Sequence, residues 1–392
     1  MYKVATLNKI SHVGLNLFPN DYSFTENVSE AHGILVRSQD MLDMQFSDEL
    51  LTIARAGAGV NNIPCDRCAE EGIVVFNTPG ANSNAVKELV LAAMLADARN
   101  LYDAMHWTHK LYQKEEADIA KTVEKGKGQF AGHELKGKKI CVIGLGAIGV
   151  LVANACEALG MNVVGYAPFM TTEAAHALSS TVRYSLNIKE AVSDCDYISI
   201  HVPASPATNG MINAELIKEM KEGACVLNFA RDKLVDEVAM LEALENDKLR
   251  KYITDFPNDT IVGKKNVIYI PHLGASTEEA EDNCAVAAVN SLMAYIEHGS
   301  IEHSVNYPNC PICHFERNKG RSRICILNKN VPAMLGKITS VLAELNCNID
   351  NMVNKSKGDF AYTAIDVDSV VDEAVLKEKL SFEGIIRVRV II

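Results

Sequence analysis

The chain has 392 residues, of which 48% are hydrophobic and 22% charged, a composition typical of a folded globular protein rather than a disordered one. Its 38 Lys and Arg against 50 Asp and Glu give a net charge of -12, so its overall field does not attract nucleic acid or anionic lipid. An anionic ligand must therefore be held by a few local cations. The length suggests about two or three domains.

The eleven cysteines are dispersed through apolar stretches, as in Ile140-Cys141-Val142, which indicates reduced thiols rather than a disulfide framework. The first residues form a strand-like pattern without an apolar leader, and no window approaches the ~20 apolar residues of a membrane span. We therefore expect a cytoplasmic protein with no membrane partner. Two close cysteine pairs, Cys65/Cys68 and Cys310/Cys313, lie in a helical pattern and in a linker, so we expect no metal site.

The first hundred residues alternate strand and helix patterns. Apolar runs at 33–37, 51–55 and 72–76 predict buried strands, and the periodicity over 85–100 predicts a long helix. Such alternation favours a parallel sheet with helices on both faces. Residues 112–139, rich in Lys, Glu and Gly, are typical of a solvated connection.

The alternation restarts at residue 138. Six further strands are predicted, at 139–144, 162–166, 197–202, 225–229, 251–255 and 267–270. A long helix over 277–297 follows, and Pro308 and Pro311 mark a linker. Beyond the linker the pattern has the βαββαβ order of a ferredoxin-like domain. The predicted fold class is α/β, with two doubly wound, Rossmann-like parallel-sheet domains and a C-terminal ferredoxin-like domain.

A glycine-rich loop, Gly144-Leu145-Gly146-Ala147-Ile148-Gly149, stands between a predicted strand and a predicted helix. That context is what the G-x-G-x-x-G dinucleotide fingerprint requires. The glycines permit a tight turn and close backbone approach, so the helix N-terminus can face a pyrophosphate.

The second half of that fingerprint is missing. An Asp or Glu normally follows about 20 residues later to bind the ribose hydroxyls, but Ala167 occupies the end of the next strand. No Arg or Lys follows directly to favour a 2′-phosphate; Thr171 and Thr172 are weak polar candidates. We predict NAD as the cofactor, and the discrimination between NAD and NADP stays open.

Three strand ends after this loop carry an Arg, a His and two acids. Arg231 follows one strand, His272 another, and Asp255 and Asp259 a third; the carboxyl ends of strands form the ligand crevice of open α/β sheets. A guanidinium can bind an α-carboxylate bidentately, and an imidazole can take the C2 hydroxyl proton as hydride leaves. Each residue also has an ordinary structural interpretation, as an ion pair or a turn residue.

The sequence resembles the D-isomer-specific 2-hydroxyacid dehydrogenase family. The resemblance is carried by segments spanning residues 1 to about 306: 55–63, 77–83, 144–149, 201–203, 228–231 and the specific Pro-His-Leu-Gly-Ala-Ser-Thr block at 271–277. It implies Arg231 as the substrate-binding arginine and His272 as the acid/base. It further implies a cofactor site lined by Gly144, Gly146, Ala147, Ile148, Gly149, Pro168, His201, Val202, Pro203, Ala230, Gly274 and Ala275. The implied reaction is NAD-dependent oxidation of 3-phospho-D-glycerate to 3-phosphohydroxypyruvate, which begins L-serine synthesis.

The resemblance also implies domain boundaries. Residues 1–97 and 283–306 would form a split substrate-binding domain, 98–282 the dinucleotide-binding domain, 307–321 a linker and 322–392 a regulatory domain. The family has Glu where Asp259 stands, so we predict Asp259 as the shorter partner of His272 and Asp255 as the nicotinamide-carboxamide partner. For the substrate's phosphate end we favour Arg55, with Ala56 and Gly57 beside it; Lys127 is a weaker helper, and both Arg55 and Arg37 have structural alternatives.

Residues 322–392 resemble an ACT domain, a small amino-acid-sensing module. Asn330 and Asn348 match its effector-binding asparagines, which implies L-serine as a possible effector, whereas Ala333 replaces its usual turn glycine. The alternative is that this module only mediates dimerisation.

Two other functions of the whole protein stay open: another D-2-hydroxyacid dehydrogenase, such as a glyoxylate or hydroxypyruvate reductase, and a dinucleotide-sensing corepressor-like scaffold. We expect a homodimer or homotetramer that binds a small anionic substrate and no nucleic acid.

Overall fold

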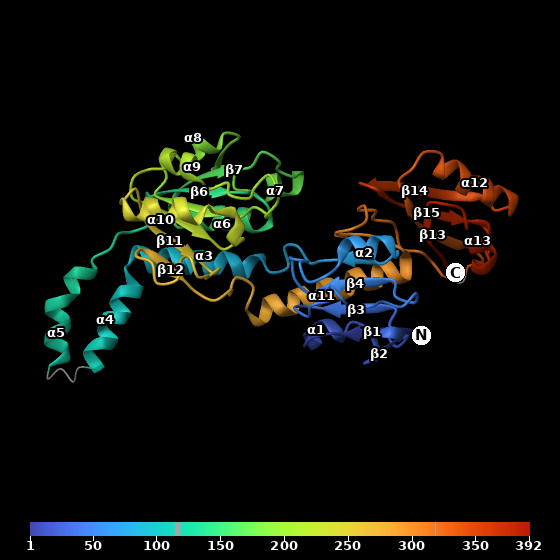
Figure 1. Cartoon of the computed structure of the whole chain (residues 1–392), viewed down its shortest axis with the longest axis horizontal. Coiled ribbons are helices and arrows are strands. Elements are labelled where there is room, and N and C mark those ends of the chain that lie inside the picture. Colours follow the sequence, from blue (N-terminus) through green and yellow to red (C-terminus); the bar gives the residue numbers. More distant parts are fainter. Residues whose placement is uncertain (114–117, 318) are drawn as a thin grey trace. The chain divides into compact units, whose positions relative to one another are not determined.

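The computed structural model describes residues 1–113, 118–317 and 319–392 (Figure 1). Contacts divide the chain into two compact units, Met1–Asn82 with Glu281–Ile392, and Ser83–Ala280. The finer boundaries given above stay a prediction. Parts of the predicted connection and linker, residues 114–117 and 318, lie outside the described residues.

The first unit contains a five-stranded parallel sheet. Its strands are β1 (Tyr2–Thr6), β2 (Tyr22–Thr25), β3 (Gly33–Val36), β4 (Thr52–Arg55) and β5 (Val74–Phe76), in the order β2-β1-β3-β4-β5. Helices α1 (His12–Leu15), α2 (Cys65–Glu70) and the long α11 (Glu278–His298) accompany it. The three predicted strands are confirmed. Edge strand β2 was not predicted, because it is only partly buried and lacks an apolar run.

The C-terminal residues of this unit form the predicted βαββαβ module. It comprises β13 (Ser322–Lys329), α12 (Met334–Glu344), β14 (Ile349–Lys357), β15 (Phe360–Val367), α13 (Glu373–Lys379) and β16 (Ile385–Ile391), with antiparallel order β14-β15-β13-β16. The helices cover one face, where Ile338 and Leu376 pack against Ile324. Tyr362 and Leu327 instead share a core with α11.

The sheet of this module caps the end of α11. Arg389 donates to the carbonyls of Tyr295 and Ile296, Arg323 donates to that of His298, and the Tyr362 hydroxyl donates to that of Gly299. The last carbonyls of a helix have no partner within the helix and favour positive charge. The module is therefore anchored on the end of α11, within the same unit, by satisfied, largely buried polar contacts.

The second unit is a seven-stranded parallel sheet with helices on both faces. Its strands are β6 (Lys139–Ile143), β7 (Asn162–Tyr166), β8 (Arg183–Ser185), β9 (Tyr197–Ile200), β10 (Ala224–Asn228), β11 (Leu249–Thr254) and β12 (Val267–Tyr269), in the order β12-β11-β10-β9-β6-β7-β8. Its helices include α3 (Ser83–Ala98), α6 (Ala147–Ala158), α7 (Thr172–Ala177), α8 (Ile188–Val192), α9 (Ala214–Glu219) and α10 (Glu237–Glu245). The six predicted strands are confirmed; the exposed edge strand β8 was not predicted.

Helix α4 (Leu101–Gln113) leads into the predicted connection of residues 112–139, and α5 (Ile119–Gly126) lies within it; the two helices lie side by side in Figure 1. A 3₁₀ turn over Lys127–Phe130 follows, and Phe130 packs on Trp107 at 5.3 Å between ring centroids. Most of α5 is exposed, as the polar composition predicted.

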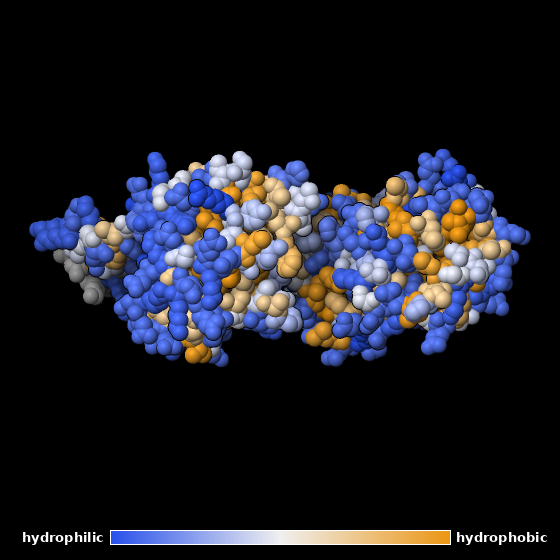
Figure 2. Space-filling model, turned by 90° about the horizontal axis from the view of Figure 1, so that it is seen from above, coloured by the Kyte–Doolittle hydropathy of each residue, from blue (hydrophilic) through white to orange (hydrophobic). Residues whose placement is uncertain are grey.

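Much of the face shown in Figure 2 is hydrophilic, with apolar residues scattered over it. All eleven cysteines are free thiols. In the described ranges, no helix combines the length and apolar character needed to cross a bilayer.

Candidate active site

The glycine-rich loop has the backbone geometry that its motif predicts. Gly144 has a φ of +94°, and a Cβ there would lie 2.7 Å from the His201 carbonyl oxygen. A Cβ on Gly149 would lie 1.8 Å from the carbonyl oxygen of Gly144. Both positions therefore require glycine.

The N-terminus of α6 has no side-chain cap. Gly146 is its N-cap residue and offers no side chain, whereas Thr171, Asn213 and Asp236 cap α7, α9 and α10. The first amides of a helix are unpaired within it and attract anions. The loop thus leaves these amides available for a pyrophosphate.

His201, Val202 and Pro203 follow β9, the neighbour of β6. The strand order reverses at this pair, and such a reversal is where open α/β sheets bind nucleotides. Nε2 of His201 lies 2.8 Å from Ser199 Oγ, whereas its buried Nδ1 has no hydrogen-bond partner in the described part of the chain. Burial lowers the pKa of His201 to about 3, so the ring is neutral at physiological pH.

At the end of β7, Ala167 is buried and leaves the ribose position without a carboxylate. Pro168 beside it is exposed. The hydroxyl of Thr171 is used to cap α7, at 3.2 Å from the Ala174 amide. No acidic residue therefore replaces the one missing from the fingerprint at this strand end.

Arg231 is placed by a turn that Asn228 organises. The buried Asn228 side chain accepts from the amides of Ala230 and Arg231 and donates to the Arg231 carbonyl at 2.8 Å. The Arg231 guanidinium hydrogen-bonds the Ala230 carbonyl and forms no ion pair with a described carboxylate. Its charge is thus not neutralised by a carboxylate of the described residues.

Asp255 directly follows β11 and is fully buried. Its Oδ2 accepts from the Gly274 amide at 3.0 Å, whereas its buried Oδ1 has no hydrogen-bond partner among the described residues. Burial raises the pKa of Asp255, and the Gly274 amide and His272 act in the opposite direction. An orphaned buried acceptor is rare in proteins; an amide donor on a bound nicotinamide would satisfy it.

His272 is exposed and its ring lies 4.7 Å from that of Phe256, between centroids. Asp255 is close enough for His272 to act on its pKa. Asp259 is exposed and, among the described residues, makes no ion pair. It is therefore Asp255 whose pKa responds to the charge of His272, and the pairing of Asp259 with His272 stays a prediction.

In the first unit, Arg55 ends β4 and its Nε donates to the Arg37 carbonyl at 2.9 Å. Gly57 donates to the Thr78 hydroxyl, and Ala56 is buried between them. The Arg37 guanidinium pairs with Glu281 at 2.6 Å. The predicted phosphate-binding segment is thus a rigid strand end with an arginine on it.

The remaining predicted residues are scattered. Val202, Pro203, Ala230 and Ala275 lie in the loops that follow β9, β10 and β12, and Ile148 lies in the first turn of α6. Lys127 is exposed and pairs with Glu124 at 2.6 Å.

Asn330 follows β13 at the start of β15, whereas Asn348 precedes β14 at the far end of β15. One module therefore does not bring the two asparagines together.

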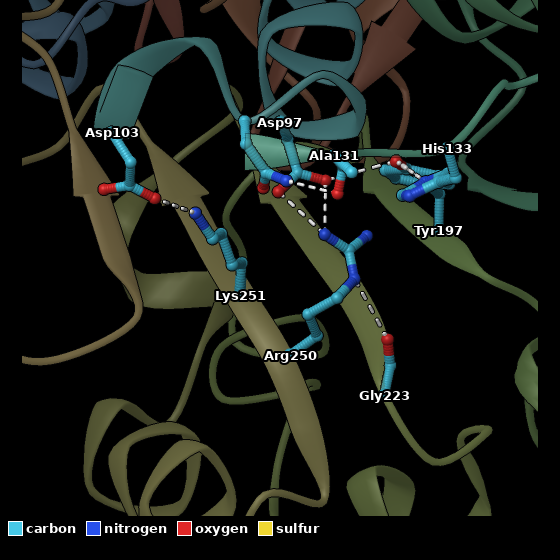
Figure 3. A network of polar contacts seen from close by, with 9 residues as sticks. Asp97, Asp103, Ala131, His133, Tyr197, Gly223, Arg250 and Lys251 are labelled. Carbon is cyan, nitrogen blue, oxygen red and sulfur yellow. Dashed lines mark hydrogen bonds and ion pairs between the residues drawn. The ribbon is translucent and has the colours of Figure 1, made fainter. Parts of the chain in front are cut away.

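Sequence reasoning missed a buried polar network at the amino ends of the strands (Figure 3). Both Asp97 oxygens accept from Arg250, at 2.7 and 2.6 Å, and the Tyr197 hydroxyl donates to Asp97 and contacts His133. The partners are 153 and 100 residues apart. Only the acidic residue within the apolar pattern of α3 hints at such a partner. Within the described residues, no group of three or more His, Cys, Asp or Glu is arranged to hold a metal ion.

Residues 91–274 match the family model "D-isomer specific 2-hydroxyacid dehydrogenase, NAD binding domain". A D-3-phosphoglycerate dehydrogenase of Methanocaldococcus jannaschii is 37% identical over 295 residues, which cover 73% of this chain and 54% of that protein. One of Haemophilus influenzae is 30% identical over 380 residues, covering 93% of this chain and 88% of the relative. The chain thus spans about half the length of the archaeal relative and most of the bacterial one.

Among solved structures, the chain is similar to an NAD⁺-bound 3-phosphoglycerate dehydrogenase of Entamoeba histolytica. The TM-score is 0.61 at 26% identity, with 78% of this chain and 98% of the other covered. A glyoxylate reductase of Paecilomyes thermophila has a TM-score of 0.62 at 21% identity, which shows a shared fold.

Proposed function

The chain belongs to the D-isomer-specific 2-hydroxyacid dehydrogenase family, and we propose that it oxidises 3-phospho-D-glycerate to 3-phosphohydroxypyruvate with NAD, the first step of L-serine biosynthesis. The observation that carries this proposal is the shared strand edge: the uncapped α6, Arg231, Asp255 and His272 all follow carboxyl ends of one parallel sheet. The relatives named above, D-3-phosphoglycerate dehydrogenases, support the substrate.

Arg231 binds the substrate carboxylate and donates to the oxygen on C2. A guanidinium offers two parallel N–H groups to a carboxylate, and no carboxylate of the described chain competes for this one. The Asn228-organised turn holds the arginine in place before substrate arrives, which lowers the entropic cost of orientation.

His272 takes the proton of the C2 hydroxyl while the C2 hydride leaves, so that the C2 carbon–oxygen bond becomes a carbonyl. An exposed imidazole can exchange that proton with solvent afterwards. Asp255 stabilises the imidazolium that forms, because a nearby negative charge favours the cation. Asp259 is proposed only as a second carboxylate partner.

The cofactor fits the residues present. Gly144, Gly146 and Gly149 leave room for the pyrophosphate at the α6 amides, and the orphaned Oδ1 of Asp255 suits the nicotinamide carboxamide. When bound, NAD supplies the ring that accepts the hydride. Because Ala167 cannot repel a 2′-phosphate, we expect weak discrimination against NADP.

Arg55 binds the phosphate of the substrate. It stands at a strand end of the first unit, beside Ala56 and Gly57, and supplies the local positive charge that a chain of net charge -12 needs for an anionic substrate. Lys127 is a weaker candidate, because its ammonium already pairs with Glu124.

The reverse reaction tests the function directly. Phosphohydroxypyruvate with NADH should be consumed, followed by NADH absorbance, with a kcat/KM at least about tenfold above those for glyoxylate and hydroxypyruvate. The opposite order would assign a glyoxylate or hydroxypyruvate reductase. An absence of turnover with cofactor binding retained would favour a dinucleotide-sensing scaffold.

The oligomeric and regulatory parts of the proposal rest on the C-terminal module, which we take to be an ACT domain. Because Asn330 and Asn348 lie at opposite ends of β15, an L-serine molecule touching both asparagines requires a second copy of the chain, consistent with a homodimer or homotetramer. Titration of activity with L-serine tests this, and a flat response would leave the module a dimerising unit. The eleven free cysteines support a cytoplasmic location.

A further inference from the structure

Two arginines follow neighbouring strands of the first unit. Arg37 comes directly after β3 and Arg55 ends β4, and the two strands pair in parallel. The Arg55 Nε donates to the Arg37 carbonyl, and a Cβ on Gly57 would lie 2.9 Å from the Arg55 Nη1. The two arginines therefore lie at the same edge of the sheet, where the phosphate of the substrate is proposed to bind.

The backbone of the segment that begins with Arg37 is fixed by one side chain. The amides of residues 37–39 all donate to Oδ1 of Asn8, at 3.1, 2.9 and 2.9 Å. Successive amides of this kind can bind an anion, but the Asn8 oxygen already occupies them. An anion at this strand end therefore depends on the arginine side chains rather than on these amides.

The Arg37 guanidinium has an anionic partner within the protein. Its Nη1 lies 2.6 Å from Oε1 of Glu281, in the first turn of α11, and both side chains are more than a third exposed. An ion pair with this exposure contributes about 1 kcal/mol or less, so an incoming anion can displace the carboxylate from Arg37 at low cost. The Glu281 carboxylate thus occupies a position on Arg37 that a phosphate oxygen can take.

Three charged side chains meet around the buried thiol of Cys284. Burial raises the pKa of this thiol, and a hydrogen bond with Thr78 lowers it. Arg37 and Arg55 also lower that pKa, whereas Glu281 raises it, so the acid belongs to the same cluster as both arginines. The cluster combines two positive charges with one negative charge.

We propose that Glu281 is a specificity-determining residue, which competes with the phosphate of the substrate for Arg37 and so limits the preference for phosphorylated over unphosphorylated substrates. This role rests on the proposed function, in which this edge of the first unit binds the phosphate. A phosphate monoester carries close to two negative charges at pH 7, so a carboxylate beside the arginines that bind it opposes its binding. A substrate without a phosphate places no charge there and is not opposed.

The kinetic test is Glu281→Gln, which removes the charge and keeps the size of the side chain. With phosphohydroxypyruvate and NADH, KM should fall about threefold to fivefold with little change in kcat, while kcat/KM for hydroxypyruvate changes less than about twofold. Glu279→Gln makes the same change at an exposed residue of α11 that takes part in no ion pair of the described residues, and should leave KM unchanged. An unchanged or raised KM in Glu281→Gln would overturn the proposal, because a carboxylate that only orients Arg37 helps the phosphate to bind. An equal gain with hydroxypyruvate would overturn it too.

A binding measurement separates this role of Glu281 from the proposed function. Calorimetric titration of the NAD-saturated protein with inorganic phosphate needs no turnover, and NAD occupies the α6 amides that would otherwise attract phosphate. Glu281→Gln should bind phosphate about threefold to fivefold more tightly than the wild type, and the gain should shrink as KCl is raised, since salt screens exposed charges. Arg37→Gln should bind phosphate more weakly than the wild type.

Two outcomes of this titration decide between the hypotheses. Equal phosphate affinity in the wild type, Glu281→Gln and Arg37→Gln, or no saturable binding in any of them, would overturn the proposal. Tighter binding in Glu281→Gln without turnover of phosphohydroxypyruvate would support the competition of Glu281 for Arg37 and refute only the proposed substrate.

Discussion

The two edges of the seven-stranded sheet, at the amino and the carboxyl ends of its strands, differ in whether their buried polar groups are hydrogen-bonded. At the amino edge, Asp97, Arg250 and Tyr197 satisfy one another (Figure 3). At the carboxyl edge, Asp255 and His201 each keep a buried atom that no described residue hydrogen-bonds. Since buried polar groups are almost always paired, the difference separates an edge built for stability from one built to receive ligands.

The largest expected effect is at the carboxyl edge, where His272→Asn removes the proposed proton acceptor. We expect kcat to fall about 10³-fold, the typical contribution of a positioned general base, with the thermal transition unchanged because His272 is exposed. Steady-state kinetics and calorimetry measure the two quantities. His12→Asn, at an exposed position of the first unit, is the control; a wild-type kcat for His272→Asn would remove the residue from the mechanism.

At the amino edge, a substitution should lower the stability of the protein and leave kcat nearly unchanged. Asp97→Asn leaves the Arg250 charge largely buried and unpaired, so the free energy of unfolding should fall by about 3 kcal/mol, measured by urea denaturation. The folded fraction should keep a near-normal kcat. Asp103→Asn breaks the exposed pair with Lys251 at 3.4 Å and should cost less than about 1 kcal/mol. Equal losses from both variants would contradict the assignment of the network to stability.

The sequence predicted what depends on local backbone geometry and periodicity. The Gly144–Gly149 turn follows from sterics that only glycine meets, and the apolar runs of β3, β6 and β10 follow from complete burial on both faces. Strands β2 and β8 were not predicted, because exposed edge strands need no apolar run.

Side-chain contacts between residues far apart in the sequence could not be predicted, for a different reason. Nothing local links Asp97 to Arg250, 153 residues away, and their contact exists only once α3 packs on the sheet. The family resemblance favours Asp259 as the partner of His272, which stays a prediction, and the tertiary fold in addition brings Asp255 close enough for His272 to act on its pKa. The separation of Asn330 from Asn348 follows from strand register, which a motif match does not contain.

Restoring a carboxylate that binds the ribose should make the carboxyl edge discriminate more strongly between NAD and NADP. Ala167→Asp is expected to shift the ratio of kcat/KM for NAD over NADP about tenfold toward NAD, because a carboxylate binds the ribose hydroxyls and repels a 2′-phosphate. Ala167→Asn has the same size without the charge and should shift the ratio little. A similar shift in both variants would show that space at this buried position, not charge, sets the preference.

The smallest expected effect is on the free energy of unfolding, which the buried carboxylate of Asp255 at the carboxyl edge lowers at neutral pH. Burial raises the pKa of Asp255, so the folded state binds its proton more tightly than the unfolded state, and stability falls as pH rises from the ordinary pKa of Asp through the raised value. Asp255→Asn removes this titration and should raise the free energy of unfolding at neutral pH by roughly 1 kcal/mol while weakening cofactor binding. Denaturation curves at acidic and neutral pH should show the advantage shrinking as the wild-type carboxyl becomes protonated. A gain that does not change with pH would mean that packing, rather than the buried charge, limits stability at this edge.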